Sequence, residues 1–303
     1  MGQKSVIILS ILLSVPLWSQ QETQFWLAPY QLNTVNPAVV GMEGNPQLIL
    51  HSNSQWTSIE DAPRTFAFSY ATKTSNKLGI GINFVSDQVY VEKQTQAFVD
   101  FSYPLQLSGD LFLQLGLKGG GNFYNAAAQN LRFTGSNFDP AQRSINTFRP
   151  NIGAGLYLQY QTFWLSLSQP NLIAHTLDDI EWVQAQDRVH TYAALGFDYL
   201  FTESWSFKPS LQLQKVKGLP HLYTFGVAFA YQKKADFGLT RRSTGEWGLL
   251  TFFPISSKIF VGYAFAQPTN KKLSGLQVRS HEVLLKFTLA EGKDRVAFEK
   301  ENQ

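Results

Sequence analysis

Leu-Phe-Leu-Gln-Leu-Gly-Leu-Lys, residues 111–118, places leucine at every second position. Successive side chains of a β-strand point to opposite faces, so all four leucines would share one face. The other face would carry Phe112, Gln114, Gly116 and Lys118. The stretch therefore predicts a strand with one apolar face and one face that needs water or polar partners.

The same alternation recurs between residues 48 and 289, in runs of about ten residues separated by turns. Residues 78–84 and 205–214 are two further examples. Counting the runs gives about fourteen strands, and an even number is typical of bacterial single-chain barrels. The sequence predicts an all-β fold: a single-chain transmembrane antiparallel β-barrel of about 14 strands.

The charged residues of these runs test the prediction, because Lys or Arg facing lipid at the bilayer midplane costs about 2–4 kcal/mol. Six charges fall in phase with the polar or small residues of their own runs, namely Asp100, Lys118, Asp198, Lys208, Glu282 and Lys286. None of them therefore needs to face lipid. A soluble β-sandwich would also alternate, so the pattern alone leaves the compartment open.

Residues 1–20 have the pattern of a secretory signal peptide. Lys4 precedes an apolar stretch at 6–17, and Ser19 is a small residue near a plausible cleavage point. The apolar stretch is shorter than the ~20 residues that a transmembrane helix needs. We therefore expect an exported protein, and an export signal favours a membrane barrel.

The composition excludes several other classes. Charged residues make up 16% of the chain and the net charge is +3, too small and too dispersed for a nucleic-acid-binding surface. There is no cysteine, so disulfides and Cys-type zinc sites are excluded. The mean hydropathy is only −0.14, as expected when each strand turns half of its residues to lipid.

The connections between the runs alternate in length. Short turns are predicted at 73–76, 107–110, 160–162, 201–204, 232–234 and 254–257, and longer loops at 56–64, 86–93, 122–147, 169–187 and 266–278. The connections at 217–220 and 242–245 are short and do not fit. Outer-membrane barrels have short periplasmic turns and long extracellular loops.

These patterns divide the chain into a signal peptide (1–20), a periplasmic N-terminal segment (21–46), an outer-membrane barrel (47–290) and a charged periplasmic tail (291–303). An even number of strands places both ends of the barrel on the same side. We expect the protein to be integral to the outer membrane of a Gram-negative bacterium, with both termini in the periplasm.

No residue pattern indicates catalysis. The five histidines are scattered without metal-ligand spacing, and His281 and Glu282 would point to opposite faces of one strand. Asp178, Asp179 and Glu181 could ligate calcium, but a solvated acidic loop is the favoured interpretation because regularly spaced ligands are missing. We expect a non-enzymatic protein with no cofactor and no metal.

Several short motifs are spread along the chain. They are Gln24-Phe25, Tyr30, Asn36-Pro37-Ala38-Val39-Val40-Gly41, Gln55-Trp56, Ala62-Pro63, Ser168-Gln169-Pro170-Asn171-Leu172, Gly262-Tyr263 and Ser280-His281-Glu282-Val283-Leu284-Leu285. In this order they resemble the PorP/SprF family of type IX secretion and gliding-associated outer-membrane proteins. The resemblance spans essentially the whole mature chain.

The resemblance implies attachment rather than catalysis. It implies a barrel in outer-membrane lipid that assists type IX secretion and holds a secreted adhesin C-terminal domain or a periplasmic peptidoglycan-associated component. Its motif positions, mostly structural, are Asn36, Pro37, Ala38, Gly41, Gln55, Trp56, Ala62, Pro63, Pro170, Asn171, Gly262, Tyr263, Ser280, His281 and Glu282. Partner-binding residues stay open, and nucleic acid is not an expected partner.

A passive channel is the competing hypothesis. The segment Asn36-Pro37-Ala38 also resembles the N-terminal hatch of FadL-type barrels. A barrel of this width could enclose a lumen for a small or hydrophobic solute, lined by polar residues such as Asn83, Asn151, Gln212 and Gln214.

Overall fold

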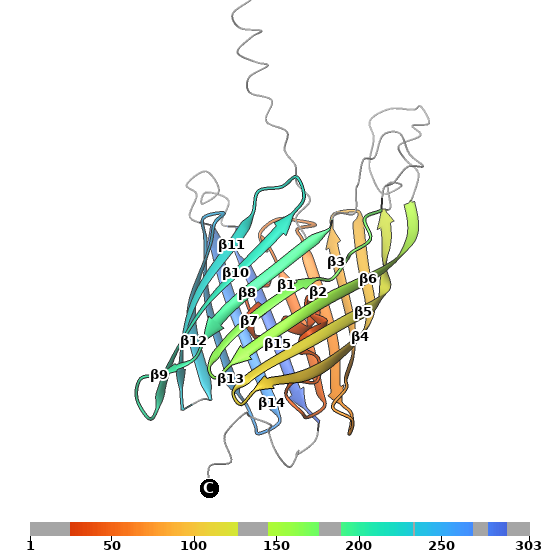
Figure 1. Cartoon of the computed structure of the whole chain (residues 1–303). Helices are drawn as coiled ribbons and strands as arrows, with labels where there is room; N and C mark the ends of the chain where they lie inside the picture. The colour runs from red at the N-terminus through yellow and green to blue at the C-terminus, as the bar shows by residue number, and fades with distance from the viewer. Residues whose placement is uncertain (1–24, 127–144, 176–188, 233, 269–277, 290–303) are drawn as a thin grey trace, which may run out of the picture.

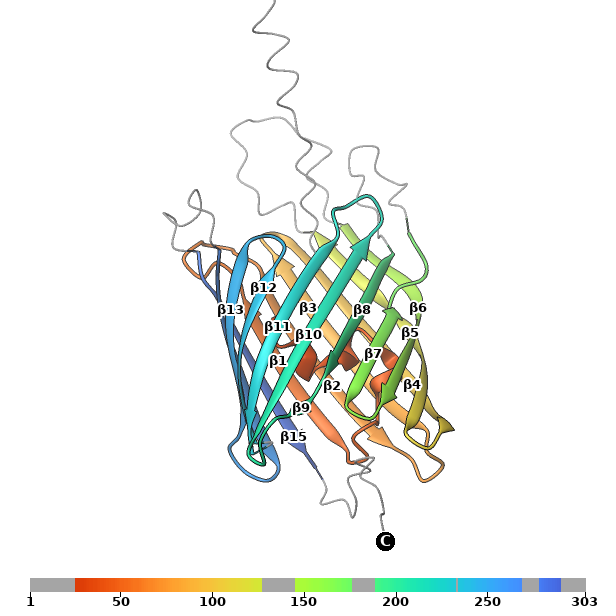
Figure 2. The ribbon, with the colours of Figure 1, turned by 60° about the vertical axis from the view of Figure 1, so that its left-hand side comes forward.

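The computed structural model describes residues 25–126, 145–175, 189–232, 234–268 and 278–289. These residues form a barrel of strands inclined to its axis (Figures 1 and 2). The strands are β1 (Gln47–Ser54), β2 (Arg64–Lys73), β3 (Gly79–Val89), β4 (Glu92–Ser108), β5 (Leu111–Ala126), β6 (Ile145–Tyr160), β7 (Phe163–Gln169), β8 (His190–Phe197), β9 (Tyr199–Leu200), β10 (Trp205–Val216), β11 (Leu222–Tyr231), β12 (Ala235–Arg242), β13 (Glu246–Pro254), β14 (Ile259–Pro268) and β15 (Ser280–Thr288).

Apart from the consecutive β8 and β9, which do not pair with each other, every strand pairs antiparallel with its neighbours along the chain. The first strand, β1, also pairs with the last, β15, which closes the sheet and removes its edges. β8 and the short β9 both pair with β10, so together they cross the wall once. The result is a closed barrel of 14 strands, which confirms the predicted fold class and strand number.

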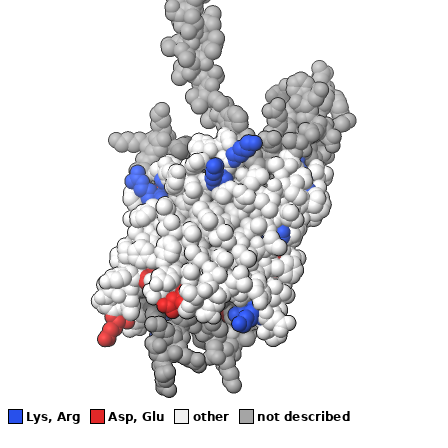
Figure 3. Space-filling model, viewed as in Figure 1, with Lys and Arg blue, Asp and Glu red and all other residues white. Residues whose placement is uncertain are grey.

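The two faces of the wall also agree with the prediction. Leu115 and Leu117 on β5 are exposed on the outside, whereas Gln114 and Lys118 are buried on the inside. The six charges that were predicted to avoid lipid all point inward; Asp100 and Glu282, for example, have no exposed surface. Figure 3 shows the outcome, because most of the outer surface between the two ends is uncharged.

The predicted short turns all lie at one end of the barrel, which we call the short-turn end; it is the lower end in Figure 1. The opposite end is called the long-loop end. One predicted long loop, 86–93, is wrong, because β3 runs to Val89 and β4 begins at Glu92. Tyr90, with φ +55°, helps to make this hairpin tight.

A second difference concerns strand length. β5 and β6 extend to Ala126 and from Ile145, into the loop predicted at 122–147. Both errors have one cause: towards the long-loop end the outward residues include polar ones such as Ser86, Gln88 and Asn125, so the alternation of apolar and polar residues in the sequence fades before the strands end. The loops predicted at 122–147, 169–187 and 266–278 lie partly outside the described residues. The signal peptide and the tail after 290 lie entirely outside them. No helix of the described part is long and apolar enough to cross a membrane.

The N-terminal segment differs most from the prediction. The sequence places residues 21–46 in the periplasm, but the structure has residues 25–40 inside the barrel (Figures 1 and 2). This stretch, here called the plug, contains three short 3₁₀-helices: η1 (Ala28–Tyr30), η2 (Leu32–Thr34) and η3 (Pro37–Val39). The physical reason is that the inward polar and charged side chains of the wall find their partners in the plug backbone.

Candidate functional site

The first contact of the plug with the wall is a carboxylate clamp on Glu282 of β15. The backbone N–H groups of Trp26 and Leu27 donate to its two oxygens over 2.8 and 2.7 Å. His51 of β1 lies against the same carboxylate, with 2.7 Å between Nε2 and Oε1, and both side chains are fully buried. One side chain therefore satisfies two orphan amides of the plug and a wall histidine at once.

Aromatic and apolar contacts surround this clamp. The guanidinium carbon of Arg242 lies 3.5 Å from the centre of the Trp26 ring, a cation–π arrangement. Phe25 stacks on His51 with 4.0 Å between ring centres. Trp26 and Leu27 also join an apolar core inside the barrel, whose other members are Ile49, Leu250, Ala264, Ala266 and Leu284. The start of the plug is thus held by both polar contacts and buried apolar surface.

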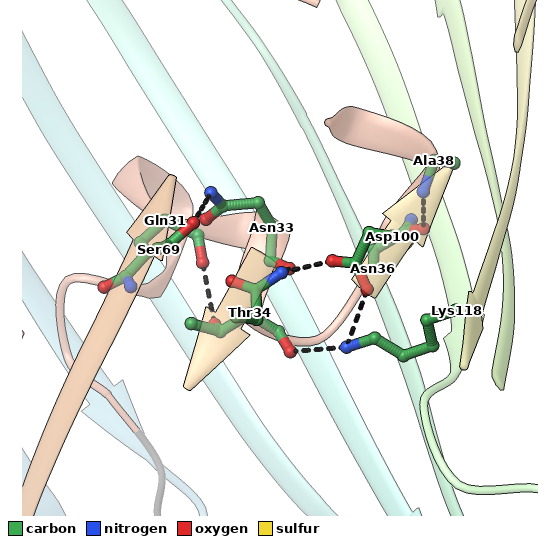
Figure 4. A network of polar contacts seen from close by, with 9 residues as sticks. Gln31, Asn33, Thr34, Asn36, Ala38, Ser69, Asp100 and Lys118 are labelled. Carbon is green, nitrogen blue, oxygen red and sulfur yellow. Dashed lines mark hydrogen bonds and ion pairs between the residues drawn. The ribbon is translucent and has the colours of Figure 1, made fainter. Parts of the chain in front are cut away.

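A second set of contacts holds the middle of the plug (Figure 4). Lys118 of β5 donates to the carbonyl of Thr34 over 3.2 Å and lies 3.7 Å from the carboxylate of Asp100 on β4. Asn83 of β3 donates to the carbonyl of Asn33 over 3.1 Å and also contacts Asp100. Lys118 and Asp100 therefore form a buried ion pair next to the plug backbone.

Replacing Lys118 with methionine is expected to destabilise the protein by about 3–5 kcal/mol, because the Asp100 carboxylate then stays buried without its cation. Urea unfolding of the purified protein in detergent measures the change. The control is the double variant D100N/K118M, which removes both charges and should recover much of the loss. Equal urea midpoints for the single variant and the wild type would contradict this account.

The third contact is the motif Asn36-Pro37-Ala38. The side-chain oxygen of Asn36 accepts the N–H of Ala38 over 2.9 Å and so caps η3. Its amide nitrogen donates to Ser166 Oγ over 2.8 Å and to the carbonyl of Leu156 over 3.0 Å. Asn36 is fully buried, so this side chain both shapes η3 and fixes it to β6 and β7.

Glycines of the inner wall make room for the plug. A Cβ added to Gly116 would overlap the backbone of Pro37 and Ala38, and one added to Gly155 would overlap the side chain of Asn36. A Cβ on Gly79 would meet the carbonyl of Val40. Because backbone atoms cannot give way, Gly116 and Gly79 require glycine for the plug to lie so close, and Gly155 leaves room for the buried side chain of Asn36.

A cavity of about 1170 Å³ lies between the plug and the short-turn end. Tyr30 of the plug donates to Asp236 of β12 over 2.9 Å at its wall, and Lys208 of β10 lies 3.1 Å from the same carboxylate. Burial and the nearby charge of Asp236 raise the pKa of the Tyr30 hydroxyl above its usual range, which keeps it a hydrogen-bond donor. Asp110, Gln161 and Asp198 also line the cavity.

The structure brings only part of the motif positions together. Asn36, Pro37 and Ala38 are buried in the plug, and Gly41, with φ +75°, approaches Gly79 directly after it. Three more positions, Gly262, Ser280 and Glu282, are buried on the inner side of β14 and β15. Of these three, Gly262 lies under the side chain of Leu27 and Glu282 forms the clamp.

The remaining motif positions lie elsewhere. Gln55, Trp56, Ala62 and Pro63 belong to the β1–β2 connection at the long-loop end, where the N–H of Gln55 donates to the carbonyl of Pro63 over 3.0 Å. Pro170 and Asn171 are buried just after β7. Tyr263 and His281 face outward and contact each other over 2.8 Å, so His281 and Glu282 do lie on opposite faces.

Sequence reasoning missed His51 and the pairing of Asp100 with Lys118. His51 and Glu282 are both in the inward phase of their strands, β1 and β15, which pair when the barrel closes. A barrel closed by its first and last strands would therefore have predicted that the two side chains lie close together. Within the described residues, no group of three potential metal ligands lies together. Asp178, Asp179 and Glu181, the alternative calcium ligands, lie outside them.

Comparison with solved structures finds outer-membrane proteins of low sequence identity. The chain is similar to Acinetobacter baumannii Omp33 (10% identity, TM-score 0.46, covering 81% of this chain and 99% of that one). It is also similar to a Pseudomonas aeruginosa FadL homologue (9%, 0.45, 84% and 93%) and to the Pseudomonas putida toluene transporter TodX (8%, 0.47, 88% and 93%).

No curated protein matches the sequence significantly. The family model for the type IX secretion system membrane protein PorP/SprF matches residues 19–287, which includes the plug and nearly the whole barrel. The chain belongs to the PorP/SprF family of type IX secretion system membrane proteins.

Proposed function

We propose that this protein is a non-enzymatic outer-membrane barrel that assists type IX secretion and anchors a secreted adhesin or a periplasmic type IX component at the membrane. The observation that carries the proposal is the plug, which occupies the lumen of a barrel whose family serves secretion. A lumen obstructed by the protein's own chain suits an attachment platform better than a conduit.

The contacts of the plug are spread around the wall. They reach Asp236 on β12, Glu282 on β15, Asn83 on β3, Lys118 on β5 and Ser166 on β7. Each contact is a hydrogen bond to an inward side chain, and several of these side chains are buried. Removing the plug would break these hydrogen bonds and expose the buried side chains of Trp26 and Leu27 to water, so opening the lumen is costly.

We place the short-turn end in the periplasm and the long-loop end outside, by the usual asymmetry of such barrels. β1 begins and β15 ends at the short-turn end, so in this orientation both ends of the barrel wall would face the periplasm. A peptidoglycan-associated component would then meet the short-turn end, and an adhesin C-terminal domain would meet the long loops.

Co-purification tests the proposal. Affinity-tagged protein expressed in its own cells and extracted in mild detergent is expected to retain a secreted protein with a type IX sorting domain or a periplasmic type IX component. The control is an unrelated tagged barrel from the same cells. Recovery of neither class above that control, together with normal secretion after deletion of the gene, would refute the proposal.

The cavity at the short-turn end favours the alternative, a passive channel for small or hydrophobic solutes, because it could admit a solute to the lumen. Liposome swelling with the purified intact protein separates the two functions. The attachment proposal expects swelling close to that of empty liposomes. Robust solute flux through the intact protein, without any effect of deletion on secretion, would favour the channel.

A further inference from the structure

The outer surface of the wall carries an unusual arrangement of charge. Among the strand residues that the structure describes, four charged side chains are in phase with the outward apolar residues: Arg64, Lys93, Lys215 and Arg241. All four are cationic and exposed, and all four lie at the long-loop end of their strands. We call them the cationic rim.

Two of these cations belong to a continuous polar row. The strand register places six outward residues side by side across β1 to β6: Ser54, Arg64, Gln88, Lys93, Asn125 and Asn146. Arg64 and Lys93 are separated only by Gln88, so their backbones are about 10 Å apart at the usual strand spacing. The row offers two cations and several amide or hydroxyl groups, and it contains no carboxylate.

The row directly beneath, two residues closer to the membrane centre, consists of Ser52, Phe66, Ser86, Thr95, Phe123 and Phe148, so half of it is aromatic. Phe66, Phe123 and Phe148 stand in register there and are 45%, 50% and 53% exposed. Aromatic residues at this level mark the boundary between acyl chains and headgroups in membrane barrels. The cations therefore stand at the level of the lipid headgroups.

The other two cations, on the opposite part of the wall, also lie close to exposed aromatic residues. Arg241 of β12 lies over the ring of Trp247 on β13, 4.8 Å from its centre, and is in register with exposed Phe225 of β11. Lys215 stands at the end of β10, next to the strand of exposed Tyr223. Most of the basic side chains visible in Figure 3 lie near the long-loop end, whereas the acidic ones, together with one basic group, lie near the short-turn end.

We propose that the cationic rim binds the phosphate groups of lipids in the leaflet at the long-loop end. Arginine recognises phosphate through paired N–H groups, and basic residues at the membrane surface attract anionic headgroups. The sign of the charge, its restriction to one end and its continuity with the lipid-facing aromatic belt all fit this occupant. In the orientation proposed above, on which this last step rests, the lipid is the phosphorylated glycolipid of the outer leaflet.

Binding of diphosphorylated lipid A to the purified full-length protein in neutral detergent micelles tests the proposal. Two double variants, R64Q/K93Q and K215Q/R241Q, each remove two rim charges. At about a fivefold loss of affinity per cation, each pair is expected to weaken binding by about 25-fold. The matched control is K234Q/K258Q, which removes two charges from turns at the short-turn end and should leave the affinity unchanged.

Three results would overturn the proposal: an equal loss in K234Q/K258Q, equal binding of dephosphorylated lipid A by the wild type, or full competition by inorganic phosphate at the lipid concentration used. The last result would indicate a site for free anions instead of lipid. The charge-preserving variant R64K/K93R should keep most of the affinity, which separates the role of charge from misfolding. Because binding is measured on isolated protein, its failure is independent of the co-purification test of the proposed function.

Discussion

Replacing Glu282 with glutamine is expected to release the start of the plug and to let ions pass through the barrel. The Glu282 carboxylate accepts the N–H groups of Trp26 and Leu27 on two different oxygens. Glutamine has only one acceptor oxygen, so its NH₂ group would face one of these donors. The loss of a buried, charged acceptor is expected to cost about 3–5 kcal/mol.

Two measurements check this expectation. Conductance of single proteins in planar bilayers should rise from a closed or weakly conducting level, and the urea midpoint in detergent should fall. The matched control is Glu203→Gln, which makes the same chemical change in an exposed turn at the short-turn end. If E282Q and E203Q behave alike in both assays, the clamp does not hold the plug.

The sequence predicts the wall of this protein well because the bilayer imposes a strict rule on it. Every second residue from Leu111 to Leu117 meets lipid, and a charge in that phase would be costly, so alternation is visible without any alignment. The same rule fails beyond the apolar belt. At Gln88 or Asn125 both faces of the strand meet water or polar groups, and the ends of β3 and β5 could not be placed.

The plug could not be placed for a different reason. Residues 25–40 have no periodicity, and their partners lie far away in the sequence: Trp26 and Glu282 are 256 positions apart. Such a contact exists only after the barrel has closed. The motif Asn36-Pro37-Ala38 did mark the segment through its resemblance to the family, but it gave no indication that Asn36 reaches Ser166 across the lumen.

Replacing Gly116 with leucine is expected to displace η3 from the wall while leaving all the strand pairings of the barrel intact. Any Cβ at this position would overlap the backbone of Pro37 and Ala38, and backbone atoms cannot adjust as a flexible side chain can. We expect higher conductance and a decrease in the free energy of unfolding of about 1–3 kcal/mol, the usual cost of overpacking. The same strand supplies the control: Gly119 is in the opposite phase, and a Cβ there has no neighbour within 4 Å.

Gly119→Leu should therefore fold and conduct no more than the wild type, since it adds an apolar side chain to the lipid-facing surface. The comparison also separates the two attachments of the plug. Gly116→Leu acts on η3 and leaves the Glu282 clamp intact, whereas E282Q frees Trp26 and Leu27 and leaves Asn36 bound to Ser166. If both attachments are needed to close the lumen, each single variant should conduct partially and the combination should conduct most. Equal conductance of G116L and G119L would mean that η3 does not close the lumen.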